Sequence, residues 1–453
     1  MPVSVAPVTT QTTVTTNNRC DVLVIGGGPA GSTISTLLAR KGWRVVTLEK
    51  GHHPRFHIGE SLLPMNLPIL EELGVMQEVE AIGMRKYGAE FNSMYHNDRP
   101  PAVYYFRRAL DKGFPYAYEV KRAEFDEILF RNAARAGAET HEGVRVTNVG
   151  LRDGQPSVVD AVDEHGQARR WEATYVVDAS GRGTFLANKL DIKRCNKDHK
   201  SAAIFGHFKN VERRPGLDEG NISLYWFDHG WFWMIPFKDG TMSVGAVCWP
   251  YYLDARKVST EQFLRDTIAL CPPAAARMTN AELVSPVTAT GNYSYKADRI
   301  AGKGYLLVGD AFAFIDPVFS SGVLLAMNGG LHGAEVVDKI LNDPTCEARE
   351  IRRFNRIVRS GIDYFSWFIY RITQPAMRSM FMSPRNTFRM EEGILSLLAG
   401  DLFRDTPVRY PLFMFKVTYR LAFLLNLRDN MAARRRRRLS LVNAQKLPSG
   451  GIA

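Results

Sequence analysis

The segment Asp21–Gly31 reads DVLVIGGGPAG. Its first five residues form the short, β-branched apolar run that is typical of a buried parallel strand. Gly26, Gly28 and Gly31 then follow in the order G-x-G-x-x-G, and residues 32–40 read as a helix. A strand, a glycine-rich turn and a helix in this order predict an α/β domain that binds a dinucleotide.

Each glycine of this turn has its own role. Gly26 permits the tight turn, Gly28 lets the backbone approach a pyrophosphate, and Gly31 lets the helix pack on the strand. The helix N-terminus supplies positive potential to the phosphates. A second strand, residues 44–48, ends at Glu49, whose carboxylate we expect to accept hydrogen bonds from a ribose diol. The expected nucleotide contacts are Gly26, Gly28, Pro29, Ala30, Gly31, Glu49 and Lys50.

NAD and FAD share this fingerprint, and two further segments distinguish them. Residues 175–182 (YVVDASGR) read as a strand that runs into a turn, and residues 305–310 (YLLVGD) as a strand followed by a helical pattern. The three segments together resemble the FAD-binding set of the aromatic-hydroxylase superfamily. The resemblance implies that Asp310 binds the ribityl chain and that Arg122 lies near the cofactor. Asp310 also suits a helix N-cap, which is compatible with that role. No second G-x-G-x-x-G predicts a bound nicotinamide.

Within that superfamily, two stretches resemble motifs of the flavin-dependent halogenases. The hexapeptide WFWMIP, from Trp231 to Pro236, matches the family's W-x-W-x-I-P signature. Its alternating large residues also suit an ordinary core strand, with Trp231 and Trp233 on one face. The resemblance implies that Trp231, Trp233 and Pro236 lie along a tunnel from the flavin to the substrate. The G-E-S-L loop around Ser61 implies that this serine contacts the flavin.

Lys86 resembles the invariant lysine that halogenases carry shortly before a G-A-x-F strand. An isolated lysine is usually solvated, and the neighbouring Arg85 offers a second register, although the spacing to Gly88 favours Lys86. The resemblance implies a lysine in an apolar tunnel. There its amine hydrogen-bonds hypohalous acid or forms a haloamine with it, so that Lys86 is the expected catalytic residue.

The stretch DPVFSSGV, residues 316–323, precedes a helical pattern. Successive backbone N–H groups at such a turn form an anion nest. The resemblance implies that the amides of Ser321 and Gly322 hold halide, and that Gly322 and Val323 contact the flavin. Tryptophan halogenases have a glutamate where this chain has Phe319, so Phe319 is an expected substrate residue and free tryptophan is disfavoured. The form resembles the branch that acts on phenols and pyrroles, often attached to an acyl carrier protein.

The resemblance covers roughly residues 20–345 and implies an oxidoreductase, an FADH2-dependent halogenase of natural-product or pigment biosynthesis. A separate flavin reductase supplies FADH2. O2 and chloride or bromide then yield hypohalous acid, which reaches Lys86 and halogenates an electron-rich aromatic ring. Two alternatives remain open: an FAD-dependent aromatic hydroxylase of the same fold, and a non-catalytic flavin-binding scaffold of a membrane-associated biosynthetic complex. The W-x-W-x-I-P stretch and Lys86 favour halogenation over hydroxylation.

The expected architecture is α/β, with a Rossmann-like FAD-binding domain, an antiparallel substrate-side sheet and a helical C-terminal region. Alternating segments at 200–207, 222–227, 231–236 and 241–248 predict the sheet. We expect a disordered tail at 1–18, an FAD-binding domain at 19–185 and 296–345, a substrate-side domain at 186–295 with a contribution from 84–120, helices at 346–430, and a basic, disordered tail at 431–453.

The chain has 453 residues, of which 45% are hydrophobic and 23% charged, as in a folded protein of several domains. Its net charge of +11 is uneven, because residues 351–453 hold 19 Lys and Arg against 6 Asp and Glu. The near-neutral remainder, and the absence of a recognition motif, argue against nucleic-acid binding. The basic part predicts one local contact with an acidic partner or surface.

The five cysteines are scattered without a C-x-x-C pair, which predicts a reducing compartment and no structural zinc. His52, His53 and His57 lack partners at ligand spacing, so no metal site is expected. The Thr-rich start has no signal-peptide pattern, and no uncharged apolar run is long enough for a transmembrane helix. We therefore expect a cytoplasmic protein.

Residues 363–382 and 410–427 are rich in aromatic residues and methionine and belong to the expected helical region; Arg434–Arg438 follow. Three interpretations stay open. The helices pack on the body and the basic tail is solvated; or they form a docking face for an acidic carrier protein; or they make a peripheral membrane contact.

Overall fold

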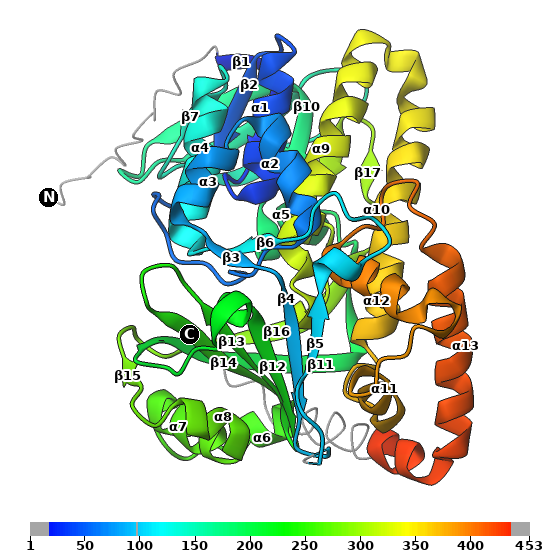
Figure 1. Cartoon of the computed structure of the whole chain (residues 1–453). Coiled ribbons are helices and arrows are strands. Elements are labelled where there is room, and N and C mark those ends of the chain that lie inside the picture. Colours follow the sequence, from blue (N-terminus) through cyan, green and yellow to red (C-terminus); the bar gives the residue numbers. More distant parts are fainter. Residues whose placement is uncertain (1–17, 97, 436–453) are drawn as a thin grey trace, which may run out of the picture.

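The computed structural model describes residues 18–96 and 98–435. Its first sheet, in the upper part of Figure 1, is built around the strand of the opening motif. The parallel strands are β7 (Glu139–His141), β2 (Val45–Leu48), β1 (Asn18–Ile25), β10 (Ala168–Asp178) and β18 (Tyr305–Leu307), in that spatial order. The antiparallel strands are β8 (Arg145–Gly150), β9 (Ser157–Val162) and β17 (Ala301–Gly302).

Helices pack against this sheet because its central strands are apolar toward both faces. Val22, Leu23 and Val24 of β1 are fully buried, so both faces of this strand are covered. The covering helices are α1 (Pro29–Arg40), α4 (Arg122–Arg135) and α9 (Ser321–Asn342). The α/β prediction is confirmed, and α1 begins at Pro29, directly after the glycine turn.

The second sheet lies below the first in Figure 1. All its neighbouring strands are antiparallel except β12 and β4, which are parallel. Its strands, in spatial order, are β19 (Ala313–Phe314), β16 (Thr288–Ala297), β11 (Lys193–Lys209), β14 (Met242–Cys248), β13 (Gly230–Pro236), β12 (Ile222–Phe227), β4 (Gly88–Ser93) and β5 (Ala102–Tyr105), with β15 (Glu282–Leu283) beside β11. Strands from 84–120 and from 186–295 thus share one sheet.

A two-stranded ribbon lies where the two sheets meet. Its strands are β3 (Met84–Lys86) and β6 (Ala117–Glu119), paired antiparallel with Lys86 opposite Ala117 and Met84 opposite Glu119. Ser61 forms an isolated bridge to Glu119. The ribbon therefore brings three segments that are distant in sequence to one place.

The C-terminal helices lie along one side of both layers (Figure 1). They are α10 (Glu347–Ile369), α11 (Pro375–Phe381), α12 (Met390–Ala399) and α13 (Arg409–Leu425). The aromatic stretch at 363–382 is divided between two helices, because α10 ends at Ile369 and α11 begins at Pro375. Proline suits the first position of a helix but not its interior. Shorter helices elsewhere are α2 (Leu67–Leu73), α3 (Met76–Ile82), α5 (Phe185–Lys189), α6 (Pro250–Asp254), α7 (Thr260–Ala269) and α8 (Pro272–Arg277).

Two further expectations need correction. No α-helix begins at Asp310, which lies in a 3-10 turn (Gly309–Ala311); Ala313 and Phe314 next pair with β16, so this part of the chain is extended and the helix begins only at Ser321. Asn18, expected in the tail, belongs to β1. Residues 1–17 and positions 436–438 of the arginine run lie outside the described residues. None of the described helices is long and apolar enough to cross a membrane.

Candidate functional site

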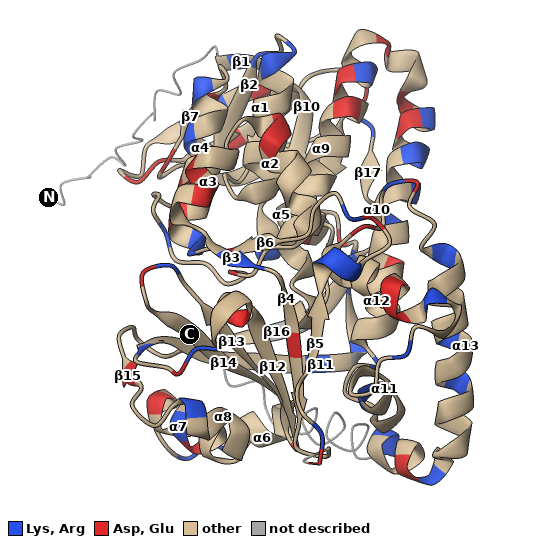
Figure 2. Ribbon diagram, viewed as in Figure 1, with Lys and Arg blue, Asp and Glu red and all other residues tan. Residues whose placement is uncertain are grey.

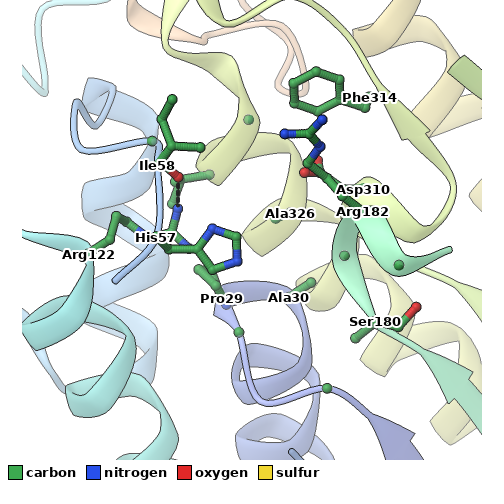
Figure 3. Close-up of a pocket in the computed structure, with 18 of the residues that line it drawn as sticks. Pro29, Ala30, His57, Ile58, Arg122, Ser180, Arg182, Asp310, Phe314 and Ala326 are labelled. Carbon is green, nitrogen blue, oxygen red and sulfur yellow. Dashed lines mark hydrogen bonds between the residues drawn. The ribbon is translucent and has the colours of Figure 1, made fainter. Parts of the chain in front are cut away.

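A cavity of about 650 Å³ opens where the carboxyl ends of the first sheet's strands face the second sheet. Figure 3 shows Pro29 and Ala30 at one edge, His57 and Arg122 on one side, and Arg182 with Asp310 on the other. Of the expected site residues, those that line the cavity are Gly26, Gly28, Pro29, Ala30, Glu49, Lys50, Ser61, Arg122, Trp231, Trp233, Asp310, Gly322 and Val323. Gly31, Lys86, Pro236, Phe319 and Ser321 are outside this lining.

The glycine turn is fixed by close backbone contacts. Gly26 has φ +105°, and a Cβ added there would lie 2.4 Å from the carbonyl oxygen of Ala179. A Cβ at Gly31 would lie 1.9 Å from the carbonyl oxygen of Gly26. Only glycine fits at either position, so Gly31 serves the packing of α1 on β1 and its absence from the cavity wall is expected.

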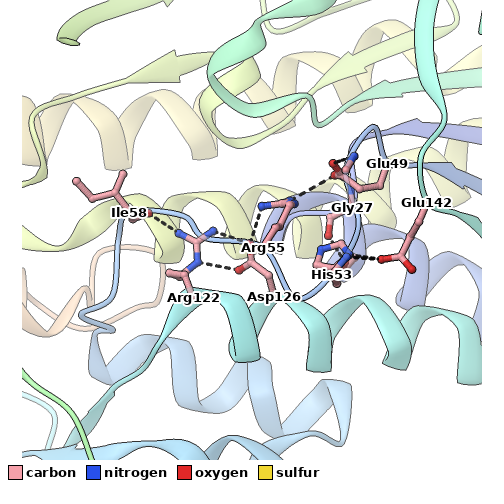
Figure 4. Close-up of polar contacts among 10 residues, drawn as sticks. Gly27, Glu49, His53, Arg55, Ile58, Arg122, Asp126 and Glu142 are labelled. Atoms are coloured by element: carbon pink, nitrogen blue, oxygen red, sulfur yellow. Dashed lines mark hydrogen bonds and ion pairs between the residues drawn. The ribbon is translucent and has the colours of Figure 1, made fainter. Parts of the chain in front are cut away.

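Glu49 is held at the end of β2 by two backbone amides (Figure 4). Gly27 N donates to its Oε2 at 2.8 Å and Gly51 N to its Oε1 at 2.9 Å. Arg55 Nη2 donates to Oε2 at 3.3 Å. The carboxylate is therefore charge-balanced and fixed beside the glycine turn.

Arg122 lies at the start of α4 and faces the cavity. Its Nε and Nη2 donate to the two carboxylate oxygens of Asp126 at 2.7 and 2.9 Å, and its Nη1 donates to Ile58 O at 2.7 Å. Arg55 Nη1 donates to Asp126 Oδ2 at 3.3 Å, which joins this group to Glu49. Sequence reasoning missed Arg55 and Asp126, although the i,i+4 spacing of Arg122 and Asp126 is a recognisable ion-pair signal.

Asp310 lies across the cavity, beside Arg182 (Figure 3). Burial raises the pKa of Asp310 to about 6, while the charges of Arg182 and Arg122 act in the opposite direction. The Arg182 guanidinium packs over the Phe314 ring, and its Nη1 donates to Thr290 Oγ1 at 3.0 Å. The guanidinium groups of Arg122 and Arg182 therefore flank the cavity, and both act on the Asp310 carboxyl.

These residues fit a bound FAD. The cavity has a suitable volume for a large cofactor. The glycine turn leaves room beside a helix N-terminus for a pyrophosphate, and carboxylates stand at two places, Glu49 and Asp310, where ribose and ribityl hydroxyls require acceptors.

The loop at 316–323 is anchored from the second sheet. Val318 N donates to Asp316 Oδ1 at 3.2 Å, and Ser201 Oγ donates to Asp316 Oδ2 at 3.2 Å. Asp316 Oδ2 also lies 3.1 Å from His199 Nε2. Sequence reasoning missed both anchoring residues on β11, since nothing local links them to Asp316.

The same loop delivers the N-terminus of α9 to the cavity. Ser320 has φ +56°, and α9 begins at the next residue. Ser321 Oγ is buried and makes no hydrogen bond among the described residues. A Cβ at Gly322 would meet no atom within 4 Å, because this position faces the open cavity. The first amides of a 22-residue helix thus point toward the space where a small anion is expected.

Lys86 is buried rather than solvated, with 1% of its surface exposed. Its Nζ donates to Ser61 Oγ at 2.7 Å and to Leu62 O at 3.1 Å. Arg85, the alternative register, is half-exposed and pairs with Glu80. Lys86 therefore lies one residue from the large cavity, since Ser61 lines that cavity and also accepts from its amine.

A second, small cavity lies on the other side of Lys86. Its wall is apolar except for Lys86 and Ser320, and consists of Leu63, Lys86, Ala89, Phe91, Phe106, Ile222, Leu224, Val318, Phe319, Ser320 and Leu398. Ile222 and Ser320 line both cavities. Phe319 is thus placed beside Lys86, and its ring stacks on Phe381 at a centroid distance of 6.1 Å.

Trp231 and Trp233 lie on one face of β13, with ring centroids 5.9 Å apart, and form the wall of the large cavity toward the second sheet. Trp233 Nε1 donates to Ser243 Oγ at 3.0 Å, which fixes its indole. Pro236 ends β13 and is buried outside the cavity lining.

Two further carboxylates lie near the site, and the sequence prediction assigned a role to neither. Glu119 on β6 lies 3.7 Å from Lys86 Nζ. Glu60 lines the large cavity, and its Oε1 lies 2.8 Å from His207 Nε2. No group of three or more His, Cys, Asp or Glu side chains within 18–96 and 98–435 is arranged to hold a metal ion.

Comparison with known proteins agrees with this geometry. The model of the FAD-binding domain family (FAD_binding_3) matches residues 19–336. A flavin-dependent halogenase of Penicillium aethiopicum (gsfI) is 35% identical over 372 residues, which cover 76% of this chain and 69% of that protein. A 1H-pyrrole-2-carbonyl-[peptidyl-carrier protein] chlorinase of Pseudomonas fluorescens is 28% identical, over 84% of this chain and 89% of that protein. The solved myxobacterial chondrochloren halogenase CndH is 32% identical, with a TM-score of 0.75, over 90% of this chain and 97% of that chain.

Proposed function

Because this chain belongs to the flavin-dependent halogenases, which are FAD-binding oxidoreductases, we propose that it chlorinates or brominates an electron-rich aromatic ring in natural-product or pigment biosynthesis. A phenol- or pyrrole-like ring attached to an acyl carrier protein is the substrate we propose. A separate flavin reductase supplies FADH2. The observation that carries the proposal is Lys86, a buried amine between the large cavity and the small apolar one.

The first part of the site holds the cofactor. We assign the pyrophosphate to the turn at Gly26–Ala30, the ribose to Glu49 and Lys50, and the ribityl chain to Asp310. Ser61, Arg122, Gly322 and Val323 line the remainder of the cavity, where the flavin ring belongs. When bound as FADH2, the cofactor would supply the two electrons and two protons that O2, a halide ion and one further proton need to yield hypohalous acid and water.

The second part holds the halide. The amides of Ser321 and Gly322 stand at the N-terminus of α9 and beside open space, so they can donate to an anion without displacing a side chain. Asp316 keeps the loop in this conformation through its bonds to Val318 and Ser201.

The third part keeps the substrate away from the flavin. Trp231 and Trp233 occupy the cavity wall, so an aromatic substrate and the flavin ring do not share one space. Hypohalous acid is small enough to pass to Lys86, whose amine presents the halogen to the ring. Separation of this kind favours halogenation over direct transfer of oxygen.

The small cavity has a volume of only about 10 Å³ and holds no ring as it stands, so we argue the substrate class from the residue types around Lys86. Phe319 and Phe91 give it apolar walls, and Phe319 carries no carboxylate with which to bind an indole N–H. The relative from Pseudomonas fluorescens acts on a pyrrole held by a carrier protein. Another relative, from Chondromyces crocatus, is a tryptophan 2-halogenase with 35% identity, so tryptophan belongs in the substrate panel.

The carrier protein has a suitable docking face on α13. Tyr410, Phe413, Leu421, Leu424 and Leu425 are exposed, Leu425 by 86%, and their spacing places them along one stripe of the helix. The accompanying exposed basic residues are Arg409, Arg420 and, beyond the helix, Arg428 and Arg434. Figure 2 shows mainly Lys and Arg along α13. Charge complementarity favours an acidic protein as the occupant.

Mass spectrometry of products tests the function. The enzyme is incubated with a flavin reductase, NADH, FAD, each halide, and a panel of free and carrier-tethered phenols and pyrroles together with tryptophan. We expect replacement of hydrogen by halogen, fastest on the tethered ring. Products that gain oxygen alone would identify a hydroxylase, and halogenation of tryptophan alone would overturn the proposed substrate class.

The docking face has a separate test. Arg420→Glu is expected to slow halogenation of the tethered substrate about tenfold and to leave the free substrate unaffected. Lys303→Glu, on the turn before β18, is the matched charge reversal. Equal rates for tethered and free rings would overturn the assignment of the carrier to α13. The same holds if the protein binds anionic phospholipid vesicles and Arg420→Glu leaves the carrier reaction unchanged.

A further inference from the structure

Glu119 is the one carboxylate that reaches the Lys86 amine among the described residues. It is carried by β6, the strand that pairs with β3, and its side chain is 0% exposed. Lys86 is 1% exposed. The β3–β6 ribbon therefore places a lysine and a carboxylate together in the interior.

The contact between the two groups is incomplete. Glu119 Oε1 lies 3.7 Å from Lys86 Nζ, close enough for charge attraction but longer than a hydrogen bond. Neither Glu119 oxygen makes a hydrogen bond of ordinary length among the described residues, although Ser61 and Lys86 lie close enough to lower the pKa of the carboxyl. The amine instead donates to Ser61 Oγ and Leu62 O. A buried carboxylate with no hydrogen bond is costly, and a structural ion pair is usually better satisfied.

Burial weakens the charged form of both partners. It raises the pKa of Glu119 to about 7, with the Lys86 charge opposing it and the Glu60 charge adding to it. Burial also lowers the pKa of Lys86, while Glu119 opposes it. The charged pair and the neutral pair of amine and carboxylic acid are consequently close in free energy, and the proton can occupy either side.

Resting on the proposed function, we propose that Glu119 is a positioning residue that exchanges one proton with the Lys86 amine during halogen transfer. An ammonium group has no lone pair with which to accept halogen, so Lys86 first passes its proton to the Glu119 carboxylate. The amine then takes halogen from hypohalous acid, R–NH2 + HOX giving R–NHX + H2O.

Halogen transfer to the aromatic ring completes the exchange, R–NHX + Ar–H giving R–NH2 + Ar–X. The Glu119 carboxylic acid donates its proton to the nitrogen as the N–X bond breaks, and the Lys86 amine takes up the proton that the ring loses and passes it back to the Glu119 carboxylate. Glu119 acts only through Lys86, and no proton has to cross the apolar wall of the small cavity.

Two measurements test this inference on the full-length protein. In flavin-free protein labelled with 13C at lysine Cε, NMR follows the Lys86 signal, assigned by its loss in Lys86→Met. Glu119→Gln removes the neighbouring anion, so the pH midpoint of Lys86 should fall. Steady-state kinetics of halogenation then give the pH profile. For the wild-type enzyme we expect this profile to contain a limb, a pH range over which the rate changes, with an apparent pKa near 7. This pKa belongs to the Lys86–Glu119 pair.

Glu119→Gln should remove that limb and lower kcat by about 10²-fold with little change in KM, whereas Glu119→Asp should restore the limb. Glu350→Gln, a buried carboxylate on α10, is the control. An unmoved Lys86 midpoint, or a wild-type pH profile in Glu119→Gln, would overturn the inference. If wild type halogenates nothing, the proposed function fails, while the NMR measurement still reports on proton exchange.

Discussion

Two buried charge clusters lie beside the cavity and are built differently. In the first, Arg122 binds Asp126 through two hydrogen bonds of 2.7 and 2.9 Å, and Arg55 links Asp126 to Glu49 (Figure 4). In the second, Lys86 and Glu119 are 3.7 Å apart without a hydrogen bond between them. Guanidinium stays protonated and fixes geometry, whereas a buried amine can lose its proton. The chain therefore uses arginine where charge is static and lysine where a proton has to move.

Replacement of Lys86 should give the largest effect. Lys86→Met is expected to lower the halogenation rate by about 10²–10⁴-fold while FAD still binds, because Met fills a similar volume but offers no amine. Lys86→Arg should not restore activity, since its guanidinium retains its proton at every accessible pH. Product mass spectrometry and flavin fluorescence titration measure the two properties. If Lys86→Arg halogenates substantially, the side chain at this position does not have to lose its proton, and the proposed difference between the two clusters is wrong.

Disruption of the cluster of Arg122, Asp126 and Arg55 should lower the stability of the fold and weaken cofactor binding. Arg122→Ala leaves Asp126, which is 0% exposed, with Arg55 at 3.3 Å as its remaining ion-pair partner. We expect the free energy of unfolding to fall by about 3 kcal/mol and FAD to bind more weakly. Urea denaturation of flavin-free protein measures the first quantity. The double variant Arg122→Leu/Asp126→Leu is the control, because it removes both charges and should recover part of the loss.

Burial of the Asp310 carboxylate lowers the free energy of unfolding, although we propose that the same carboxylate binds the cofactor. Its pKa is raised to about 6 by burial, so the folded protein binds this proton more tightly than the unfolded chain. The free energy of unfolding therefore decreases as pH rises from about 4 to 6, and the deficit persists at higher pH. Asp310→Asn should stabilise flavin-free protein by about 1–3 kcal/mol at pH 8, with no gain near pH 3. The same variant should bind FAD more weakly.

Denaturation at the two pH values, with FAD titration alongside, checks both halves of this expectation. Equal stabilisation at pH 3 and pH 8 would show that ionisation of Asp310 is not its cause. Unchanged FAD affinity would remove Asp310 from the cofactor contacts. Ile58→Val, also in the cavity wall and without a polar side chain, serves as the control for a general effect of altering the lining.

The sequence predicted those parts of the site that local chain geometry determines. The glycine turn, α1 and Glu49 lie within one βαβ unit, and their spacing alone specifies the fold. The burial of Lys86 depends on pairing with β6, which no pattern around Lys86 reveals. Glu119 was overlooked for the same reason. His199 and Ser201 meet Asp316 from 117 and 115 residues away, and strand pairing at Ala313–Phe314 overrides the helical pattern expected after Asp310.

The loop at 316–323, to which we assign the halide, should give the smallest effect, because the anion donors that we propose are backbone amides. Ser321 Oγ is buried and makes no hydrogen bond among the described residues, so Ser321→Ala removes no bond that the structure shows and should leave the free energy of unfolding within about 0.5 kcal/mol of wild type. If the hydroxyl binds halide only as an additional donor, the KM for halide should rise by less than about tenfold. Halide titration at saturating substrate measures this. A larger rise would make the Ser321 side chain, rather than the N-terminus of α9, the principal halide ligand. The anion would then be held by a group that can reorient rather than by fixed amides, and the halide site would resemble the Lys86–Glu119 pair more than the arginine cluster.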